Sequence, residues 1–217
     1  MAGLADLVLI ENILQFIGAF VSLSIAAVAV KGFRQTGSPA LLRLATAFAF
    51  LGVGFGVEGL VALGPFAAIF ATTALVGGLL LETTGYFFLA FSHVIDVTIA
   101  KRRGLALLVF PFISLSSVQA VAALSILSFY FVLYGFVETF ASYLKNRRPD
   151  TLLIAGGLAL IGTGTFVQWL SLVYPPVDVL SQVLSLVQIL MKEIGLMILF
   201  VPVIGFAMGA RKLDGTV

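Results

Sequence analysis

The chain contains no cysteine among its 217 residues, and only one histidine, His93. Without thiols it can form no disulfide, no thiolate metal site and no cysteine nucleophile. A single histidine also excludes a haem held by two histidines of this chain. The HExxH, GxSxG and P-loop patterns are absent as well. We therefore expect neither enzymatic activity nor a metal site.

Charge is almost as scarce. Lys, Arg, Asp and Glu make up 10% of the residues, whereas 61% are hydrophobic and the mean hydropathy is +1.18. A soluble domain carries about a quarter charged residues, and so few charges cannot cover a surface that faces water. The formal net charge is only +2, and no basic stripe with interleaved aromatic residues suggests nucleic-acid binding. The composition predicts an all-α, polytopic membrane helix bundle with lipid as its surroundings.

The apolar runs are long enough for about seven transmembrane helices of about 20 residues each. The N-terminus carries acidic residues where a signal peptide would carry positive charge, so we expect the first run to be retained. Gly37 is placed to end the first helix, and Pro39 suits the first turn of the second. The turn between the fourth and fifth spans is predicted near residues 114–125. The predicted spans cover residues 7–30, 39–63, 66–99, two segments within 105–144, 149–173 and 177–208.

The basic residues test this layout. Every Lys and Arg except Lys192 falls beside the ends of the predicted spans: Lys31, Arg34, Arg43, Lys101, Arg102, Arg103, Lys145, Arg147, Arg148, Arg211 and Lys212. With seven spans all of these residues lie on one face, whereas six spans would divide them between both faces. The positive-inside rule makes that face cytoplasmic. The sequence therefore predicts an integral plasma-membrane protein with its N-terminus outside and its C-terminus in the cytoplasm.

A shift of 110 residues superposes spans two and three on spans six and seven without a gap. Proline and glycine positions match, among them Pro39 on Pro149, Gly52 on Gly162, Gly54 on Gly164, Pro65 on Pro175 and Gly85 on Gly195. We interpret the chain as one membrane domain, residues 1–217, made of two parallel three-helix repeats. Repeat 1 covers residues 5–100 and repeat 2 covers 115–210. Residues 101–114 form the linker and part of a linking helix.

This shift superposes Glu82 on Lys192, and both residues lie near the middle of their spans. An isolated charge at that depth is costly, whereas a pair of opposite charges is not. We therefore expect Glu82 and Lys192 to face the bundle interior and to interact directly or through water. Glu193 is an alternative partner for Lys192, although adjacent helical residues point about 100° apart.

Other polar side chains of the spans are expected to line a track through the bundle. Ser185 and Gln188 share the helix face of Lys192, because the spacings are three and four residues. The track would run from the outer face through the central pair to the inner face, with Glu58, Gln168, Ser185, Gln188, His93 and Asp96 along it. Two structural alternatives stay open. The charged pair would then only lock the helix register, and His93 and Asp96 would be interfacial anchors.

The stretch KGFRQTGSPALLRLATAFAFLGVG resembles short archaeal multi-pass membrane proteins of unknown function, which carry a similar basic TGSPAL turn between their first two spans. The resemblance covers roughly the first half of the chain and implies no activity. It suggests that the chain is a fused pair of such units.

In architecture alone, the plan of three, one and three helices resembles the SWEET-like and vitamin-uptake transporters and the microbial rhodopsins. The rhodopsin resemblance implies retinal on Lys192 as a Schiff base, with Glu82 as its counter-ion. Two features depart from that pattern: Gln188 stands where helix seven usually has an aspartate, and Trp169 is the only tryptophan.

Three functions follow as hypotheses. The first is a membrane protein that transports or senses a small solute, ion or proton through the central charged site, with no cofactor. The second is a structural or accessory subunit of a larger membrane complex, or a homo-oligomer. The third is a retinal-binding, rhodopsin-like protein.

Overall fold

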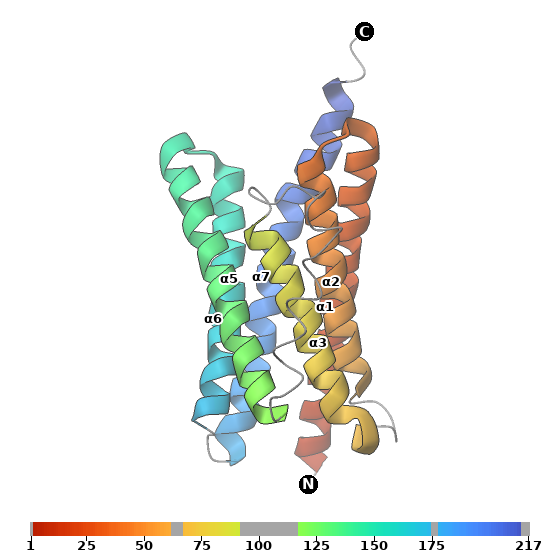
Figure 1. The fold of residues 1–217 in the computed structure, drawn as a ribbon, viewed down its shortest axis with the longest axis vertical. Coiled ribbons are helices and arrows are strands. Elements are labelled where there is room, and N and C mark those ends of the chain that lie inside the picture. The colour runs from red at the N-terminus through yellow and green to blue at the C-terminus, as the bar shows by residue number, and fades with distance from the viewer. Residues whose placement is uncertain (1, 62–66, 92–116, 175–177, 214–217) are drawn as a thin grey trace.

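The computed structural model describes residues 2–61, 67–91, 117–174 and 178–213 (Figure 1). Within these ranges the regular structure is entirely α-helical. Six helices are described: α1 (Ala2–Thr36), α2 (Pro39–Val61), α3 (Ala67–Ala90), α5 (Ser117–Asn146), α6 (Pro149–Val173) and α7 (Asp178–Leu213).

Each of the six helices contains an apolar stretch of 19 to 29 residues, which is long and apolar enough to cross a membrane. The protein is therefore a membrane-embedded helix bundle, as its composition predicts. Gly37 follows the end of α1 with φ of 67°, and Pro39 opens α2, both at the predicted places. Because the structure describes six spans, it does not establish the predicted count of about seven. The proposed linker, residues 101–114, lies outside the described ranges.

The predicted turn at residues 114–125 is wrong over most of its length. Helix α5 begins at Ser117, so residues 117–125 are helical. The turn was expected because residues 105–144 had to hold two spans, but the stretch 114–125 contains serines and neither glycine nor proline. Isolated serines are tolerated in membrane helices when their hydroxyls are enclosed by neighbouring helices. Ser125 and Ser128 are indeed buried.

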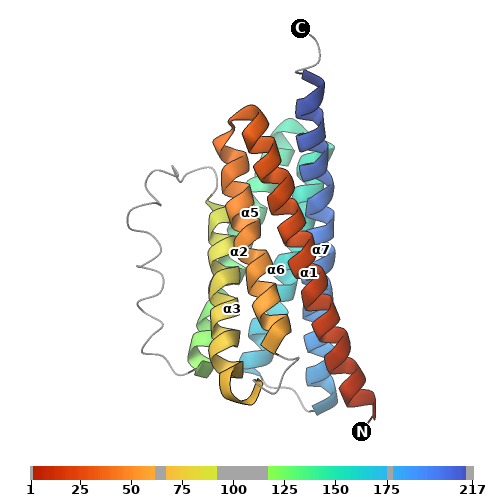
Figure 2. The same ribbon diagram turned by 90° about the vertical axis from the view of Figure 1, so that its right-hand side faces the viewer.

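The six helices run along a common axis (Figures 1 and 2). α1, α3, α5 and α7 point one way, and α2 and α6 return, so the start of α1 and the end of α7 lie at opposite ends (Figure 1). Each helix packs mainly on two others, in the order α1, α2, α3, α5, α6, α7 and back to α1. The described helices therefore close a ring, and its interior receives side chains from all of them.

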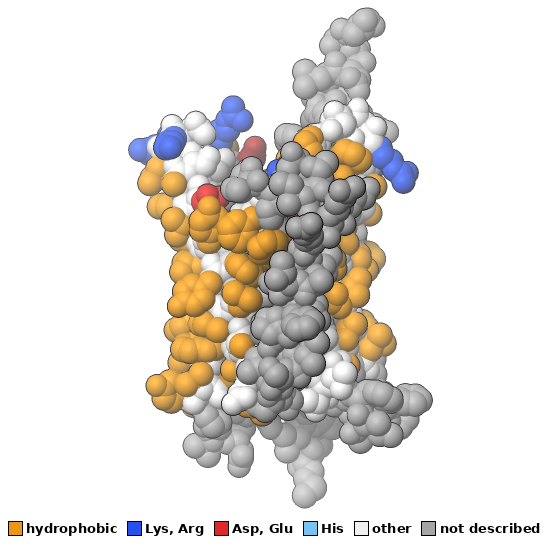
Figure 3. Space-filling view, viewed as in Figure 1, with side chains coloured by type: hydrophobic (Ala, Val, Ile, Leu, Met, Phe, Trp, Pro, Cys, Tyr) orange, Lys and Arg blue, Asp and Glu red, His pale blue; other side chains and the backbone are white. Residues whose placement is uncertain are grey.

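The interior of the ring is filled mainly by large apolar side chains, including Ile25, Phe48, Leu51, Ile161 and Leu196. Large apolar residues also cover the outside, where lipid replaces water as solvent. In Figure 3 the flank in view is mostly hydrophobic, and Lys and Arg side chains gather at the end where α1 and α5 finish. That distribution is typical of a bundle with one basic membrane face.

Two helix endings have the same geometry 110 residues apart. α1 ends at Thr36 and α5 ends at Asn146, and each is followed by a residue with positive φ, Gly37 at 67° and Arg147 at 53°. The amide of Gly37 donates to the Phe33 carbonyl at 2.7 Å, and the amide of Arg147 donates to the Tyr143 carbonyl at 2.7 Å. Both helices therefore finish in the same left-handed cap.

Candidate functional site

An ion pair lies inside the ring. Lys192 Nζ of α7 is 3.0 Å from Glu82 Oε2 of α3, and both side chains are almost completely buried. The ammonium also lies 5.7 Å from the centre of the Phe55 ring of α2, a distance at which a cation is attracted to an aromatic face. The direct contact expected between these two residues, which are 110 positions apart, is present.

Two glycines make room for this pair. A Cβ atom on Gly54 of α2 would lie 2.9 Å from the Glu82 Cγ, and one on Gly164 of α6 would lie 3.0 Å from the Lys192 Cγ. Such distances are too short for carbon atoms, so larger residues would displace both charged side chains. α2 and α6 therefore hold Glu82 and Lys192 in equivalent ways, each through a glycine.

A polar cavity of about 360 Å³ reaches the ion pair from one side. Lys192 is part of its lining, together with four residues that the sequence placed on the polar track: Glu58, Gln168, Ser185 and Gln188. They come from three helices, α2, α6 and α7. They lie near the end of α2 and in the first half of α7, so the cavity occupies the half of the bundle away from the basic end (Figure 1).

The sequence reasoning missed the contribution of α1 to this cavity. Glu11, Asn12 and Gln15 line it, and Asn12 is buried. Glu11 and Gln15 are four residues apart and therefore share one helix face. That spacing, inside an otherwise apolar run, was the available signal. It went unused because the acidic N-terminus was considered only as evidence against a signal peptide.

Several buried oxygen atoms at or beside the cavity lack a hydrogen-bond partner within the described residues. Gln15 Nε2 donates to Glu58 Oε2 at 3.2 Å. Glu58 Oε1, Glu82 Oε1, Gln15 Oε1 and Gln188 Oε1 are buried without a protein hydrogen-bond partner. Glu58 and Glu82 also interact with each other, and within the described residues Lys192 is the ammonium group beside them. This arrangement leaves an excess of negative charge and of free oxygen acceptors, which a proton, a small cation or water would satisfy.

Glu193 is not the partner of Lys192. Its side chain is only 2% exposed, and neither carboxylate oxygen has a protein hydrogen-bond partner. It lies against the backbone of α1 at Gly18, where a Cβ atom would overlap the carboxylate. Sequence reasoning treated Glu193 only as an alternative to Glu82 and gave it no place of its own.

Two members of the predicted track, His93 and Asp96, lie outside the described residues. Metal binding was not expected, and the described ranges contain no group of three His, Asp or Glu side chains arranged to hold a metal ion.

Comparison with known proteins adds no relative: no protein-family model, no curated protein and no solved structure matches this chain. The resemblance of the TGSPAL turn to short archaeal membrane proteins stays a prediction. Function is therefore argued from the site alone.

Proposed function

We propose that this integral membrane protein transports or senses a small solute, ion or proton at the Glu82–Lys192 site. The observation that carries the proposal is the cavity whose lining includes Lys192, the ammonium of the buried ion pair. Burying two charges costs several kcal/mol per ion even in favourable surroundings. A bundle that needed only stability would be served as well by apolar residues.

The charge balance favours a proton or a small cation among these possibilities. Glu58 and Glu82 lie together near the single ammonium of Lys192, and one oxygen of each carboxyl group has no protein partner. Two neighbouring carboxylates repel each other, and a proton on one of them removes that repulsion. Binding and release of that proton, or of a cation in its place, would change the charge at the centre of the bundle.

The proposal includes the orientation and the duplication. The basic end of the bundle would face the cytoplasm, and the cavity would then open toward the outside. α3 and α5 run in the same direction, so the end of α3 and the start of α5 lie at opposite ends of the bundle (Figure 1). That geometry supports a seventh crossing between them. The matching caps after Thr36 and Asn146 support two parallel repeats.

Cysteine labelling tests the access route, because the chain has no native cysteine. We expect Gln188→Cys and Ser185→Cys to react with an impermeant thiol reagent added from the side opposite the basic residues. Leu196→Cys, beyond the ion pair in the apolar core, serves as the protected control. Protection of both cavity positions, with a loop cysteine reacting normally, would mean a dry core and would contradict the proposal.

Flux measurements test the function itself. The purified protein would be reconstituted into liposomes that contain a pH-sensitive or cation-sensitive dye. We expect at least a tenfold loss of flux when Glu82→Gln and Lys192→Met are combined, since this removes the pair without leaving one charge unpaired. Gly156→Ala, at an open position on α6, is the matched control. Unchanged flux in the double variant, or no binding and no flux for any ion tested, would overturn the proposal.

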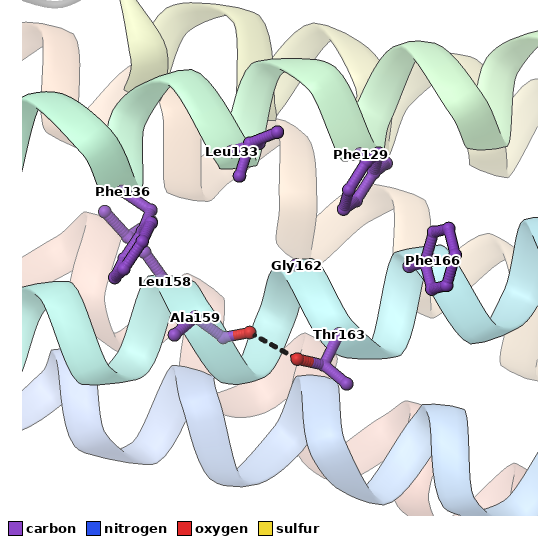
Figure 4. A pocket seen from close by; sticks show the side chains of 8 residues that line it. All are labelled: Phe129, Leu133, Phe136, Leu158, Ala159, Gly162, Thr163 and Phe166. Carbon is purple, nitrogen blue, oxygen red and sulfur yellow. Dashed lines mark hydrogen bonds between the residues drawn. The ribbon is translucent and has the colours of Figure 1, made fainter.

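A second candidate function is a subunit of a larger membrane complex. A groove of about 300 Å³ runs between α5 and α6 (Figure 4). Phe129, Phe136 and Phe166 flank it, and Ala159 and Gly162 lie among its lining residues. Small residues let helices approach closely in lipid. This alternative predicts stable co-purification with other chains, which Gly162→Leu weakens. A monodisperse monomer or homo-oligomer would count against it.

The retinal alternative has a direct test. The cavity that reaches Lys192 is lined by amide and carboxyl side chains, and Lys192 is already paired with Glu82. A polyene chain needs an apolar slot, so we do not favour this function. It predicts a visible absorption band after addition of retinal, which Lys192→Ala abolishes. A colourless protein would remove it.

A further inference from the structure

Glu193 belongs to one of two residue pairs that the shift of 110 residues superposes. In one case, Thr83 of α3 meets Ser128 of α5, with 2.8 Å between the hydroxyl oxygens. The equivalent positions on α7 and α1 are Glu193 and Gly18, which also lie against each other. Thr83 and Ser128 are thus hydrogen-bonded to each other, whereas the carboxyl group of Glu193 lies against the backbone of Gly18.

The Glu193–Gly18 pair lacks the hydrogen bond that the Thr83–Ser128 pair makes. Thr83 also donates to the carbonyl of Leu79 at 2.7 Å, so its hydrogen-bonding capacity is used. The Glu193 carboxyl group has no protein partner for either oxygen. A glycine at position 18 gives the longer side chain its space but offers no hydroxyl in return. A carboxylate buried without a partner is among the costliest groups in a protein.

The charged and titratable groups around Glu193 do not balance it. Lys192, its neighbour on α7, is bound to Glu82 of α3. The hydroxyl of Tyr86 on α3 is buried without a protein partner. On α1, Ser22 lies one helical turn beyond Gly18, and its buried hydroxyl also lacks a partner. Glu82 itself adds negative charge near Glu193.

We infer that Glu193 is a second, enclosed proton-binding site, one step beyond the Glu82–Lys192 pair; the inference rests on the proposed function. Its carboxyl group holds a proton that exchanges with the Glu82 carboxyl group. The proton leaves the O–H bond of Glu193 and forms an O–H bond on Glu82 Oε1, the carboxylate oxygen that Lys192 does not bind, and the reverse step returns it. The unpartnered hydroxyl of Tyr86, which lies within electrostatic reach of both Glu82 and Glu193, can accept or donate a hydrogen bond on this route.

The geometry selects a proton over a larger ion. Glu193 does not line the polar cavity, and its carboxyl group lies directly on the α1 backbone at Gly18. A metal ion would need several oxygen ligands and space around the carboxylate. A proton needs neither, because it forms a covalent O–H bond within the volume already occupied.

Infrared spectroscopy of the purified, lipid-embedded protein separates the two charge states of Glu193. A protonated carboxyl group has a carbonyl-stretch band that a carboxylate lacks. We expect the wild-type minus Glu193→Gln difference at neutral pH to show loss of one protonated-carboxyl band, and that band to shift in D₂O. Loss of a carboxylate band instead, or a protonated band that never shifts in D₂O, would overturn the inference.

A matched double variant guards against misfolding. Gly18→Ser combined with Glu193→Thr recreates the pair found at Thr83 and Ser128, so we expect a folded bundle that has lost the same band. A double variant that keeps the band would show that it belongs to another residue and would contradict the assignment. Flux and infrared results are separable, because the band is measured at equilibrium without a gradient. A protonated Glu193 without flux would refute only the proposed function.

Discussion

The two halves of the bundle, α1–α3 and α5–α7, use equivalent positions for different purposes. In the first half, the Gly52 position of α2 lies against Leu23 and the Ala19 carbonyl of α1, a close helix–helix contact. The equivalents of Ala19 and Gly56 in the second half are Phe129 and Phe166, which flank an open groove between α5 and α6 (Figure 4). Small residues therefore let α1 and α2 pack closely, whereas aromatic side chains line a groove between α5 and α6.

The same comparison applies to the interior. Glu82 and Lys192 occupy equivalent positions, and each lies over a glycine of the neighbouring helix, Gly54 or Gly164. The backbone plan is shared, but the sign of the charge is opposite. A symmetric frame with like charges would place two carboxylates or two ammonium groups in the core, which is strongly unfavourable. Opposite charges at the two positions instead allow the ion pair that is observed.

The largest effect is expected from breaking this pair. Lys192→Ala leaves the Glu82 charge buried alone and should cost about 3–5 kcal/mol of stability. The exchange of both charges, Glu82→Lys with Lys192→Glu, should recover most of that loss because the positions are equivalent. Denaturant unfolding of the detergent-solubilised protein measures the free energy of unfolding of the single variant and of the exchanged variant. Equal destabilisation in the single variant and in the exchanged pair would show that the two positions are not interchangeable.

A smaller effect is expected where the helices approach most closely. A Cβ atom at Gly164 would lie 2.7 Å from the Gln188 carbonyl oxygen, so Gly164→Ala should cost about 1–3 kcal/mol through overpacking. Gly156 on the same helix has no atom within 4 Å of the added carbon, and Gly156→Ala should stabilise α6 by up to about 1 kcal/mol. Thermal unfolding of the two variants compares them. A similar melting temperature for both would mean that α6 moves freely relative to α7.

The smallest effect is expected at the two helix caps. Gly37 and Arg147 both have positive φ, at 67° and 53°. Side chains other than glycine cost about 1–2 kcal/mol in this conformation. Gly37→Ala should therefore destabilise the bundle by about 1 kcal/mol, while Arg147→Gly should be neutral or slightly stabilising. A loss of stability in Gly37→Ala and a gain in Arg147→Gly, measured in the same unfolding assay, would support the shared cap. A loss of stability in both variants would argue that Arg147 makes a stabilising contact of its own.

Part of the fold was predictable because lipid imposes simple rules. Long apolar runs must be helices in a membrane, since no water can satisfy the backbone. Pro39 and Pro149 marked helix starts for a local reason, the compatibility of proline with the first turn. The turn near residues 114–125 was wrongly predicted, because serine breaks a helix only where its hydroxyl competes with the backbone in water. Within α5, Ser128 instead contacts Thr83.

The candidate site was predictable only in part. Glu82 and Lys192 could be paired in advance because two buried opposite charges have few other options. The lining by Ser185 and Gln188 followed from helix periodicity, and that by Glu58 and Gln168 from their matching positions near the outer ends of spans two and six. The α1 contribution from Gln15 did not, because periodicity shows which residues share a face but not which helix that face meets.

The sequence by itself determined that the chain lies in a membrane, that its spans are helical and that its buried charges must pair. Each of these depends on residue type and spacing along one chain, through hydropathy, helix propensity and the cost of isolated charge. Only the tertiary structure decided that Lys192 binds Glu82 while Glu193 lies unpaired against Gly18. That choice depends on the distance between helices. Glycines on neighbouring helices set this distance, and no pattern within a single helix encodes it.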